Sequence, residues 1–254
     1  MGSFEDLLAE GAAVPVEGWD FSWFAGRATE QRPPWGYSKL LRQRLATAAA
    51  AVDLQTGGGE VFAGALAGLE TAPAVLTATE SWPPNLAVAA GNLERFGVSI
   101  MDIADDAPLP FPDASFDLVS SWHPTVLSLD EVARVLRPGG TFLSQQVGPG
   151  SVRELTDFMM GPQTVGDGRS PARAEAAARE AGLAVVDLRE AALRMEFHDV
   201  AAVAVFLRKV IWIVPGFTVD GYRDRLAVLH ERILAEGPFV AYAQRFLIEA
   251  RKPD

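Results

Sequence analysis

Short apolar runs alternate with segments of helical periodicity between residues 50 and 147. Runs rich in branched and aromatic side chains predict strands at residues 50–54, 74–79, 98–103, 116–120 and 141–147. Apolar residues at helical spacing between them predict helices at residues 60–69, 85–96 and 129–136. The sequence Arg137-Pro138-Gly139-Gly140 predicts the end of a helix and a turn. This alternation is typical of an α/β protein whose parallel sheet carries helices on both faces.

After residue 147 the pattern becomes less regular. Helical spacing predicts helices at residues 151–160, 171–181, 200–214 and 222–234, and extended segments are expected at 183–188 and 193–197. The sequence "YAQRFLIEARK" at residues 242–252 alternates apolar and polar positions, which indicates a strand added to the sheet. We expect residues 1–254 to form a single domain.

The first 45 residues differ from the rest because aromatic side chains crowd a turn-rich stretch. Two interpretations fit this segment: a clasp packed on the domain, or a lid over a ligand site. The aromatic residues are Trp19, Phe21, Trp23, Phe24, Trp35 and Tyr37.

Charge and cysteine content narrow the classes of partner. The formal net charge is -11, and the nearest approach to a basic face is a thin group, so no nucleic-acid partner is expected. The basic group comprises Arg27, Arg32, Lys39, Arg42 and Arg44. The chain has no cysteine and three scattered histidines, so neither a disulfide nor a metal site is expected.

Two features bear on location. The sequence "MGSFEDLLAEG" at the start is acidic and has no apolar signal core, which predicts a cytoplasmic protein. The most apolar stretch, residues 200–215, is interrupted by Arg208 and Lys209 and is too short to span a bilayer. We therefore expect a buried helix there and no membrane partner.

The sequence "AVDLQTGGGE" joins the first predicted strand to the first helix. Ligands of open α/β sheets bind beyond the carboxyl ends of the strands. Gly57, Gly58 and Gly59 can adopt positive φ and let a ligand approach the backbone, and the following helix offers free amide donors. A plain tight turn is the alternative for three glycines alone.

Acidic residues close the next two strands. Glu80 ends "VLTATE", where a carboxylate can accept both hydroxyls of a ribose. Asp102 ends "VSIMD", where a carboxylate can accept from an adenine amino group while the next backbone N–H meets a ring nitrogen. Asp105 is a competing candidate for the adenine, because the acid cluster permits more than one register.

These segments resemble the successive motifs of class I S-adenosylmethionine-dependent methyltransferases, in the version called methyltransferase type 11. The resemblance covers about residues 45–150, and "LPFPDASFDLV" and "EVARVLRPGG" are its most specific parts. It implies a Rossmann-like, seven-stranded, mostly parallel sheet with the last strand antiparallel. It also implies S-adenosylmethionine as cofactor, with S-adenosylhomocysteine as product.

Carried over position by position, the resemblance implies a set of cofactor contacts from the loops that follow four strands. These residues are Asp53, Gln55, Thr56, Gly57, Gly58, Gly59, Glu80, Ser81, Trp82, Asp102, Ile103, Ser120 and Trp122. The chain departs from the family at Gln55 and Thr56, where the family usually has a glycine and a small residue. Either the Gln55 side chain reaches the amino-acid end of the cofactor, or the loop is displaced.

Histidines and aromatic residues are the candidates for the part of the site that would bind the methyl acceptor. His123, just past the fourth strand, is the candidate for an assisting base, with a turn-capping residue as the alternative. His198 is either a second base or, as we favour, an N-terminal helix residue with Asp199 as cap, and His230 is interpreted as a packing or surface residue. An aromatic wall around a small acceptor is expected from Trp23, Phe24, Phe197 and Trp212.

The resemblance and this wall together predict methylation of a hydroxyl or amine of a small organic metabolite. The first alternative is an RNA or protein methyltransferase, which the acidic balance disfavours. The second is a non-catalytic protein that binds S-adenosylmethionine, an alternative raised by Gln55 and Thr56.

Overall fold

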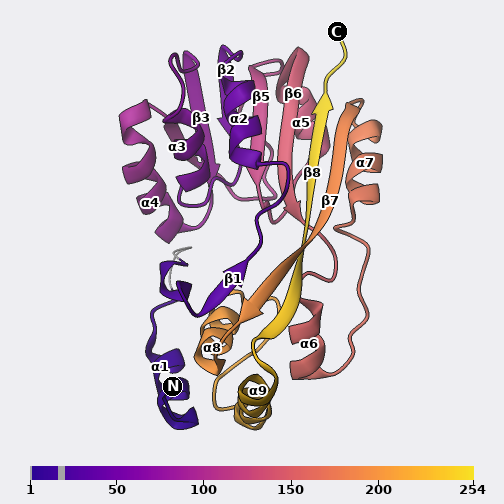
Figure 1. Cartoon of the computed structure of the whole chain (residues 1–254). Helices are drawn as coiled ribbons and strands as arrows, with labels where there is room; N and C mark the ends of the chain where they lie inside the picture. Colours follow the sequence, from indigo (N-terminus) through magenta and orange to yellow (C-terminus); the bar gives the residue numbers. More distant parts are fainter. Residues whose placement is uncertain (1, 17–20) are drawn as a thin grey trace. The chain divides into compact units, whose positions relative to one another are not determined.

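The computed structural model describes residues 2–16 and 21–254. Trp19, one of the aromatic residues of the N-terminal segment, lies outside the described residues. The chain forms two compact units. Unit 1 comprises Met1–Arg32, Pro149–Gly166 and Ala192–Gln244, and unit 2 comprises Pro33–Gly148, Asp167–Ala191 and Arg245–Asp254. Figure 1 traces the elements of both.

The elements follow one another in an alternating order. The strands are β1 (Ala28–Glu30), β2 (Ala50–Asp53), β3 (Val75–Glu80), β4 (Ser99–Asp102), β5 (Phe116–Trp122), β6 (Leu136–Val147), β7 (Ala184–Phe197) and β8 (Phe239–Arg251). The helices are α1 (Phe4–Ala13), α2 (Tyr37–Leu45), α3 (Glu60–Leu66), α4 (Pro83–Leu93), α5 (Leu129–Val135), α6 (Arg153–Met160), α7 (Pro171–Glu180), α8 (Val200–Lys209) and α9 (Arg223–Glu236).

The sheet has the order β1-β7-β8-β6-β5-β2-β3-β4. Its central strands are parallel, in the pairs β2–β3, β2–β5, β3–β4 and β5–β6, whereas β8 runs antiparallel to β6. The predicted mostly parallel sheet with an antiparallel final strand is therefore confirmed. The difference is the short strand β1, which pairs antiparallel with the end of β7 and raises the number of strands from seven to eight.

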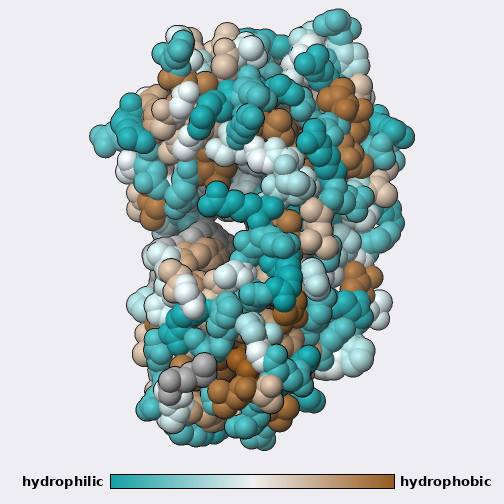
Figure 2. All heavy atoms as spheres, in the orientation of Figure 1, coloured by the Kyte–Doolittle hydropathy of each residue, from teal (hydrophilic) through white to brown (hydrophobic). Residues whose placement is uncertain are grey.

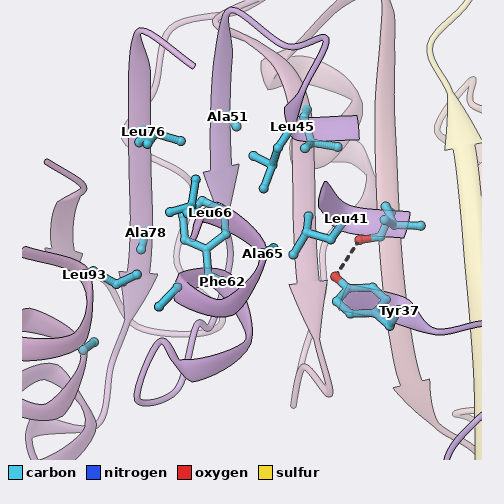
Figure 3. Close-up of a cluster of buried hydrophobic side chains, with 14 of the residues drawn as sticks. Tyr37, Leu41, Leu45, Ala51, Phe62, Ala65, Leu66, Leu76, Ala78 and Leu93 are labelled. Carbon is cyan, nitrogen blue, oxygen red and sulfur yellow. Dashed lines mark hydrogen bonds between the residues drawn. The ribbon is translucent and has the colours of Figure 1, made fainter. Parts of the chain in front are cut away.

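Helices cover both faces of the sheet in unit 2, because neighbouring strand residues point to opposite sides. On one face Ala51, Leu118, Leu143 and Leu247 pack with α2, α3 and α4, as Figure 3 shows in part. On the other face the adjoining strand residues pack with α5 and α7, and these residues are Val52, Val119, Phe142, Phe246 and Ile248. Burial on both faces explains why the strands read as continuous apolar runs.

Helix α2 was not predicted. It anchors to the sheet by its buried side chains and by Tyr37, whose hydroxyl donates to the Ser121 carbonyl (3.1 Å) and to the Leu143 carbonyl (3.3 Å; Figure 3). Arg44 pairs with the buried Glu249 of β8 at 2.8 Å. Trp35 is also buried in unit 2, and the choice between a clasp and a lid for the whole N-terminal stretch stays a prediction.

Unit 1 contains α1, α6, α8 and α9. Helix α8 is buried along nearly its whole length, as its apolar sequence predicts, but it ends at Lys209 rather than continuing to residue 214. Gly11 of α1 lets this helix approach α8 closely, because a Cβ at that position would lie 3.1 Å from Ala204. Ser3 and Asp6 form a capping box at the start of α1, another helix that was not predicted.

Two local corrections concern predicted turns. The sequence Arg137-Pro138-Gly139-Gly140 does not separate helix from strand, because β6 already begins at Leu136 and an irregularity opposite Phe116 accommodates these residues. The extended segments at 183–188 and 193–197 are parts of the one strand β7.

Hydrophilic side chains cover most of the face shown in Figure 2, and hydrophobic side chains gather there only in small groups. Within the described residues, no helix is both long and apolar enough to cross a membrane.

Candidate functional site

The candidate site lies at the carboxyl ends of β2, β3, β4 and β5 in unit 2. From β2 the chain order proceeds to β3 and β4 on one side, while β5 pairs with the other side of β2. This change of direction marks a topological switch point, which is where ligands of open α/β sheets bind.

The loop from Leu54 to Gly59 turns sharply between β2 and α3. Gly57 (φ 64°) and Gly59 (φ 77°) adopt the left-handed conformation. A Cβ on Gly59 would lie 2.9 Å from Leu93, so this glycine lets α3 approach α4. A Cβ on Gly57 would meet nothing within 4 Å. The space beside Gly57 is therefore open to a ligand.

Glu80 is a buried carboxylate, 6% exposed, that organises the backbone at the end of β3. Its Oε2 accepts from the Gly57 N–H at 2.8 Å, and its Oε1 accepts from the N–H groups of Ser81 and Trp82, both at 2.9 Å. These three bonds fix the carboxylate beside the glycine loop. Carboxylate oxygens have further lone pairs, so Glu80 can still accept from hydroxyl groups of a ligand.

Asp53 joins the glycine loop to β5. Its carboxylate accepts from the Thr56 hydroxyl at 2.7 Å and from the Ser120 hydroxyl at 2.6 Å. Burial raises the pKa of Asp53 to about 6, although both hydrogen bonds act in the opposite direction. Asp53, Thr56 and Ser120 thus support the loop by contacting one another.

Gln55 occupies the position where the family usually has a glycine, and it adopts the conformation that glycine favours (φ 53°). Its side-chain oxygen accepts from the Thr125 N–H at 2.7 Å, and its amide donates to the Val126 carbonyl. The side chain therefore binds the loop after β5. That Gln55 contacts a cofactor stays a prediction.

The two candidate acids for adenine have different surroundings. Asp102 is exposed at the end of β4, and the N–H of Ile103 donates to the Glu80 carbonyl at 3.1 Å. Asp105 accepts from the Ser81 hydroxyl at 2.8 Å and from the Thr125 hydroxyl. Asp105 and Ile103 line a small cavity beside Gln55, whereas Asp102 does not. That Asp102 or Asp105 meets an adenine stays a prediction.

Arg134 explains why two distant motifs occur together. It donates to the carbonyls of Phe111 (2.7 Å) and Leu109 (2.9 Å) and pairs with Asp113, while Glu131 accepts from the Leu109 N–H at 2.8 Å. The motif "EVARVLRPGG" thus fixes the loop that contains "LPFPD". Both motifs are recognisable in the sequence, but this contact was not predicted. The signal that could have revealed it is the opposite charge of Arg134 in one motif and Asp113 in the other.

His123 lies directly after β5, with Trp122 stacked on its ring at a centroid distance of 4.1 Å. Its backbone is left-handed (φ 57°), and its N–H donates to the Gln145 carbonyl at 2.7 Å. The ring Nε2 lies 3.1 Å from the side-chain nitrogen of Gln145, whose oxygen accepts from the Trp35 indole N–H at 2.7 Å. Burial lowers the pKa of His123 to about 3, and Arg245 contributes, so the ring is neutral at pH 7.

The predicted wall residues Trp23, Phe24, Phe197 and Trp212 all belong to unit 1. Phe197 is fully buried against Phe206, and the buried Phe24 packs edge-on against Trp23, whereas Trp212 is half exposed. That these residues face an acceptor stays a prediction.

The other two histidines, His198 and His230, belong to unit 1. Asp199 caps α8 by accepting from the Ala202 N–H at 2.9 Å, and His198 precedes it. His230 is buried on α9 against Phe4. Among the described residues, no group of three or more His, Asp or Glu side chains is placed to hold a metal ion.

Comparison with known proteins adds a family likeness. Residues 52–144 match the family model described as a methyltransferase domain. The chain is 31% identical over 189 residues to the 27-O-demethylrifamycin SV methyltransferase of Amycolatopsis mediterranei (strain S699), which covers 61% of this chain and 59% of that protein. The chain spans between 47% and 60% of the length of the curated relatives it matches.

Solved structures share the fold at low sequence identity. The geranyl diphosphate C-methyltransferase of Streptomyces coelicolor A3(2), solved with S-adenosyl-L-homocysteine, has a TM-score of 0.51 and 12% identity; the match covers 85% of this chain and 78% of that one. The [4+2]-cyclase SpnF has a TM-score of 0.52 and 17% identity, over 98% and 92% of the two chains. Together these likenesses extend the fold match beyond the residues that the family model covers.

Proposed function

We propose that this chain, whose residues 52–144 match the methyltransferase domain model, is a class I S-adenosylmethionine-dependent methyltransferase that transfers a methyl group from S-adenosylmethionine to a small organic molecule. The observation that carries this proposal is Glu80, a buried carboxylate held beside an open glycine loop at the switch point of the sheet.

The residues present fit the cofactor. The open space beside Gly57 suits the close approach of a ligand to the backbone. Glu80 would accept from the ribose hydroxyls, and Ser81 and Trp82 would lie beside the base, where the 42% exposed indole of Trp82 offers a surface for stacking. Asp105 would accept from the adenine amino group.

The chemistry needs alignment more than acid–base groups. When bound, S-adenosylmethionine supplies an electrophilic methyl group: the acceptor lone pair bonds to the methyl carbon while the carbon–sulfur bond breaks, and that electron pair remains on sulfur in S-adenosylhomocysteine. This chain orients the two reactants and excludes water between them. A hydroxyl or amine acceptor also loses its proton, either to a base or to solvent.

The acceptor class rests on two further observations. The relative from Amycolatopsis is named for a small molecule that carries a demethylated oxygen. The chain has a formal net charge of -11, which disfavours a phosphate-rich polymer. We therefore propose a hydroxyl or amine of a small metabolite as the methylated group.

Titration calorimetry with S-adenosylhomocysteine tests the binding step. We expect saturable heat, and adenosine alone should bind more weakly because it lacks the amino-acid end. No heat at concentrations up to about a millimolar, equivalent to roughly -4 kcal/mol, would overturn the proposal.

Transfer is tested separately with methyl-labelled S-adenosylmethionine and three sets of acceptors: small hydroxyl and amine compounds, RNA, and protein. Label in the small molecules supports the proposal. Salt-sensitive transfer to RNA, or transfer to protein, would replace the acceptor class. Cofactor binding without transfer to any set would favour a non-catalytic binding protein.

A further inference from the structure

Three side chains from separate parts of unit 2 form a chain of hydrogen bonds that ends at His123. The Trp35 indole N–H donates to the Gln145 side-chain oxygen at 2.7 Å, and the Gln145 side-chain nitrogen lies 3.1 Å from His123 Nε2. Trp35 and Gln145 are 6% and 4% exposed, so water competes little for these bonds.

The direction of each bond follows from which groups can donate. An indole N–H can only donate, so the Gln145 atom that faces Trp35 must be the oxygen. The other end of the same amide is then an NH₂ group, which can only donate, so His123 Nε2 must accept through its lone pair. A neutral imidazole that accepts at Nε2 carries its proton at Nδ1.

The remaining ring nitrogen is therefore a donor. Within residues 2–16 and 21–254, no protein group accepts a hydrogen bond from His123 Nδ1. The ring is held in place by Trp122 on its face and by the hydrogen bond from the backbone N–H of His123 to the Gln145 carbonyl. Arg245 of β8 is the charged group that acts on the ring, and it disfavours a second proton.

We propose that Trp35 and Gln145 hold His123 as the neutral Nδ1–H tautomer, so that His123 presents a fixed hydrogen-bond donor to the acceptor molecule and does not take its proton. This inference rests on the proposed function for the identity of the partner. It gives the substrate a further feature, an oxygen with an available lone pair, such as a carbonyl or carboxylate, near the methylated group. Gln145 and Trp35 are then positioning residues, because they act through His123.

Nitrogen NMR of the protein labelled with ¹⁵N-histidine reads the tautomer directly. The chain has three histidines, so the signals of His123 are those missing from His123→Asn. We expect a protonated Nδ1, an unprotonated Nε2, and no titration of this ring between about pH 5 and pH 8. A protonated Nε2, or titration near the ordinary value of about 6.5, would overturn the proposal.

Gln145→Glu tests the role of the amide, because a carboxylate can only accept. His123 must then carry a proton at Nε2, and its pKa should rise. Gln146→Glu is the matched control, since the same change on the adjoining residue of β6 points to the opposite face of the sheet. The spectrum of His123 should change in the first variant and not in the second. An unchanged spectrum in Gln145→Glu would contradict the proposal.

If Gln145→Glu does not fold, Trp35→Phe provides a second measurement. Without the indole N–H the amide is free to reverse, and the Nδ1–H fraction of His123 should fall; an undiminished fraction would contradict the proposal. These experiments need neither cofactor nor turnover. A failure of the inference therefore leaves the test of methyl transfer intact, and a failure of methyl transfer leaves the tautomer measured.

Discussion

The glycine loop is held mainly by bonds to its backbone, whereas His123 is oriented by bonds between side chains. Glu80 accepts from the N–H groups of Gly57, Ser81 and Trp82, which any residue other than proline would supply. The series of hydrogen bonds from Trp35 through Gln145 to His123 requires these three side chains, and Trp35 and Gln145 are 110 positions apart. The first region therefore needs few particular residues and appears in sequences as a short motif. The hydrogen bonds that orient His123 join residues far apart in the sequence, so they form no local motif, and related proteins can differ at these positions.

Replacing Glu80 is the strongest way to break the glycine-loop region. Glu80→Ala should weaken S-adenosylhomocysteine about 100-fold, because bonds to a charged acceptor contribute about 1.5–3 kcal/mol each and are not additive. Titration calorimetry measures the affinity, and thermal unfolding shows whether the three N–H groups left without an acceptor also cost stability. Glu70→Ala, on an exposed acid, is the matched control and should leave both unchanged. Undiminished affinity in Glu80→Ala would show that ribose binds elsewhere.

Asp53 joins the glycine loop to β5, the strand that leads to His123, through Thr56 and Ser120, and its titration tests how firmly the loop is held. Burial raises its pKa from 3.8 to about 6, so the folded protein holds a proton there that the unfolded chain has lost. The free energy of unfolding should therefore fall as pH rises from about 4 to about 6, by about 2–3 kcal/mol in total, and stay level above that pH.

Asp53→Asn removes the titrating carboxyl group while keeping the shape of the side chain. Urea unfolding of both proteins at several pH values should show the variant gaining on the wild type between about pH 4 and pH 6. A difference that does not vary with pH would mean that Asp53 has an ordinary pKa and that burial does not disfavour its charged form.

The smallest expected effect separates a donor from a base at His123. His123→Ala should lower kcat/KM about tenfold, the value of one ordinary hydrogen bond. His123→Asn should restore most of it, because asparagine offers an N–H and tolerates the left-handed backbone at this position (φ 57°). A loss of 100-fold or more in both variants, together with a changed pH profile, would instead identify His123 as the base.

The sequence predicted the sheet of unit 2 well because its strands are short, apolar and separated by helices of ordinary period. It did not predict α2, whose buried positions Tyr37, Leu41 and Leu45 recur at helical spacing within a polar, basic segment. The N-terminal aromatic stretch was equally ambiguous, since Trp35 is buried in unit 2 while Trp23 and Phe24 belong to unit 1. Aromatic content alone does not reveal which core a side chain joins.

Within the candidate site, the sequence placed Glu80, Asp53 and the glycines at strand ends, where the structure has them, and their contact with a cofactor stays a prediction. It could not choose between Asp102 and Asp105, a choice that depends on how the loop after β4 meets Ser81. Nor could it assign the bonds of Gln55 or the tautomer of His123. Both depend on side chains that come into contact only after the sheet has formed. The direction of a hydrogen bond also follows no periodic pattern in the sequence.

The position of β8 in the sheet has a consequence for biosynthesis. β8 lies between β6 and β7, and residues 245–251 pair with residues 141–147. A ribosome that has reached residue 144, the last residue matched by the family model, has yet to translate the strand that covers the edge of β6. At ordinary elongation rates of about 5–20 residues per second, that edge waits several seconds for its partner. During this interval the nascent chain exposes an apolar strand edge, which is the kind of surface that chaperones bind and that aggregation exploits.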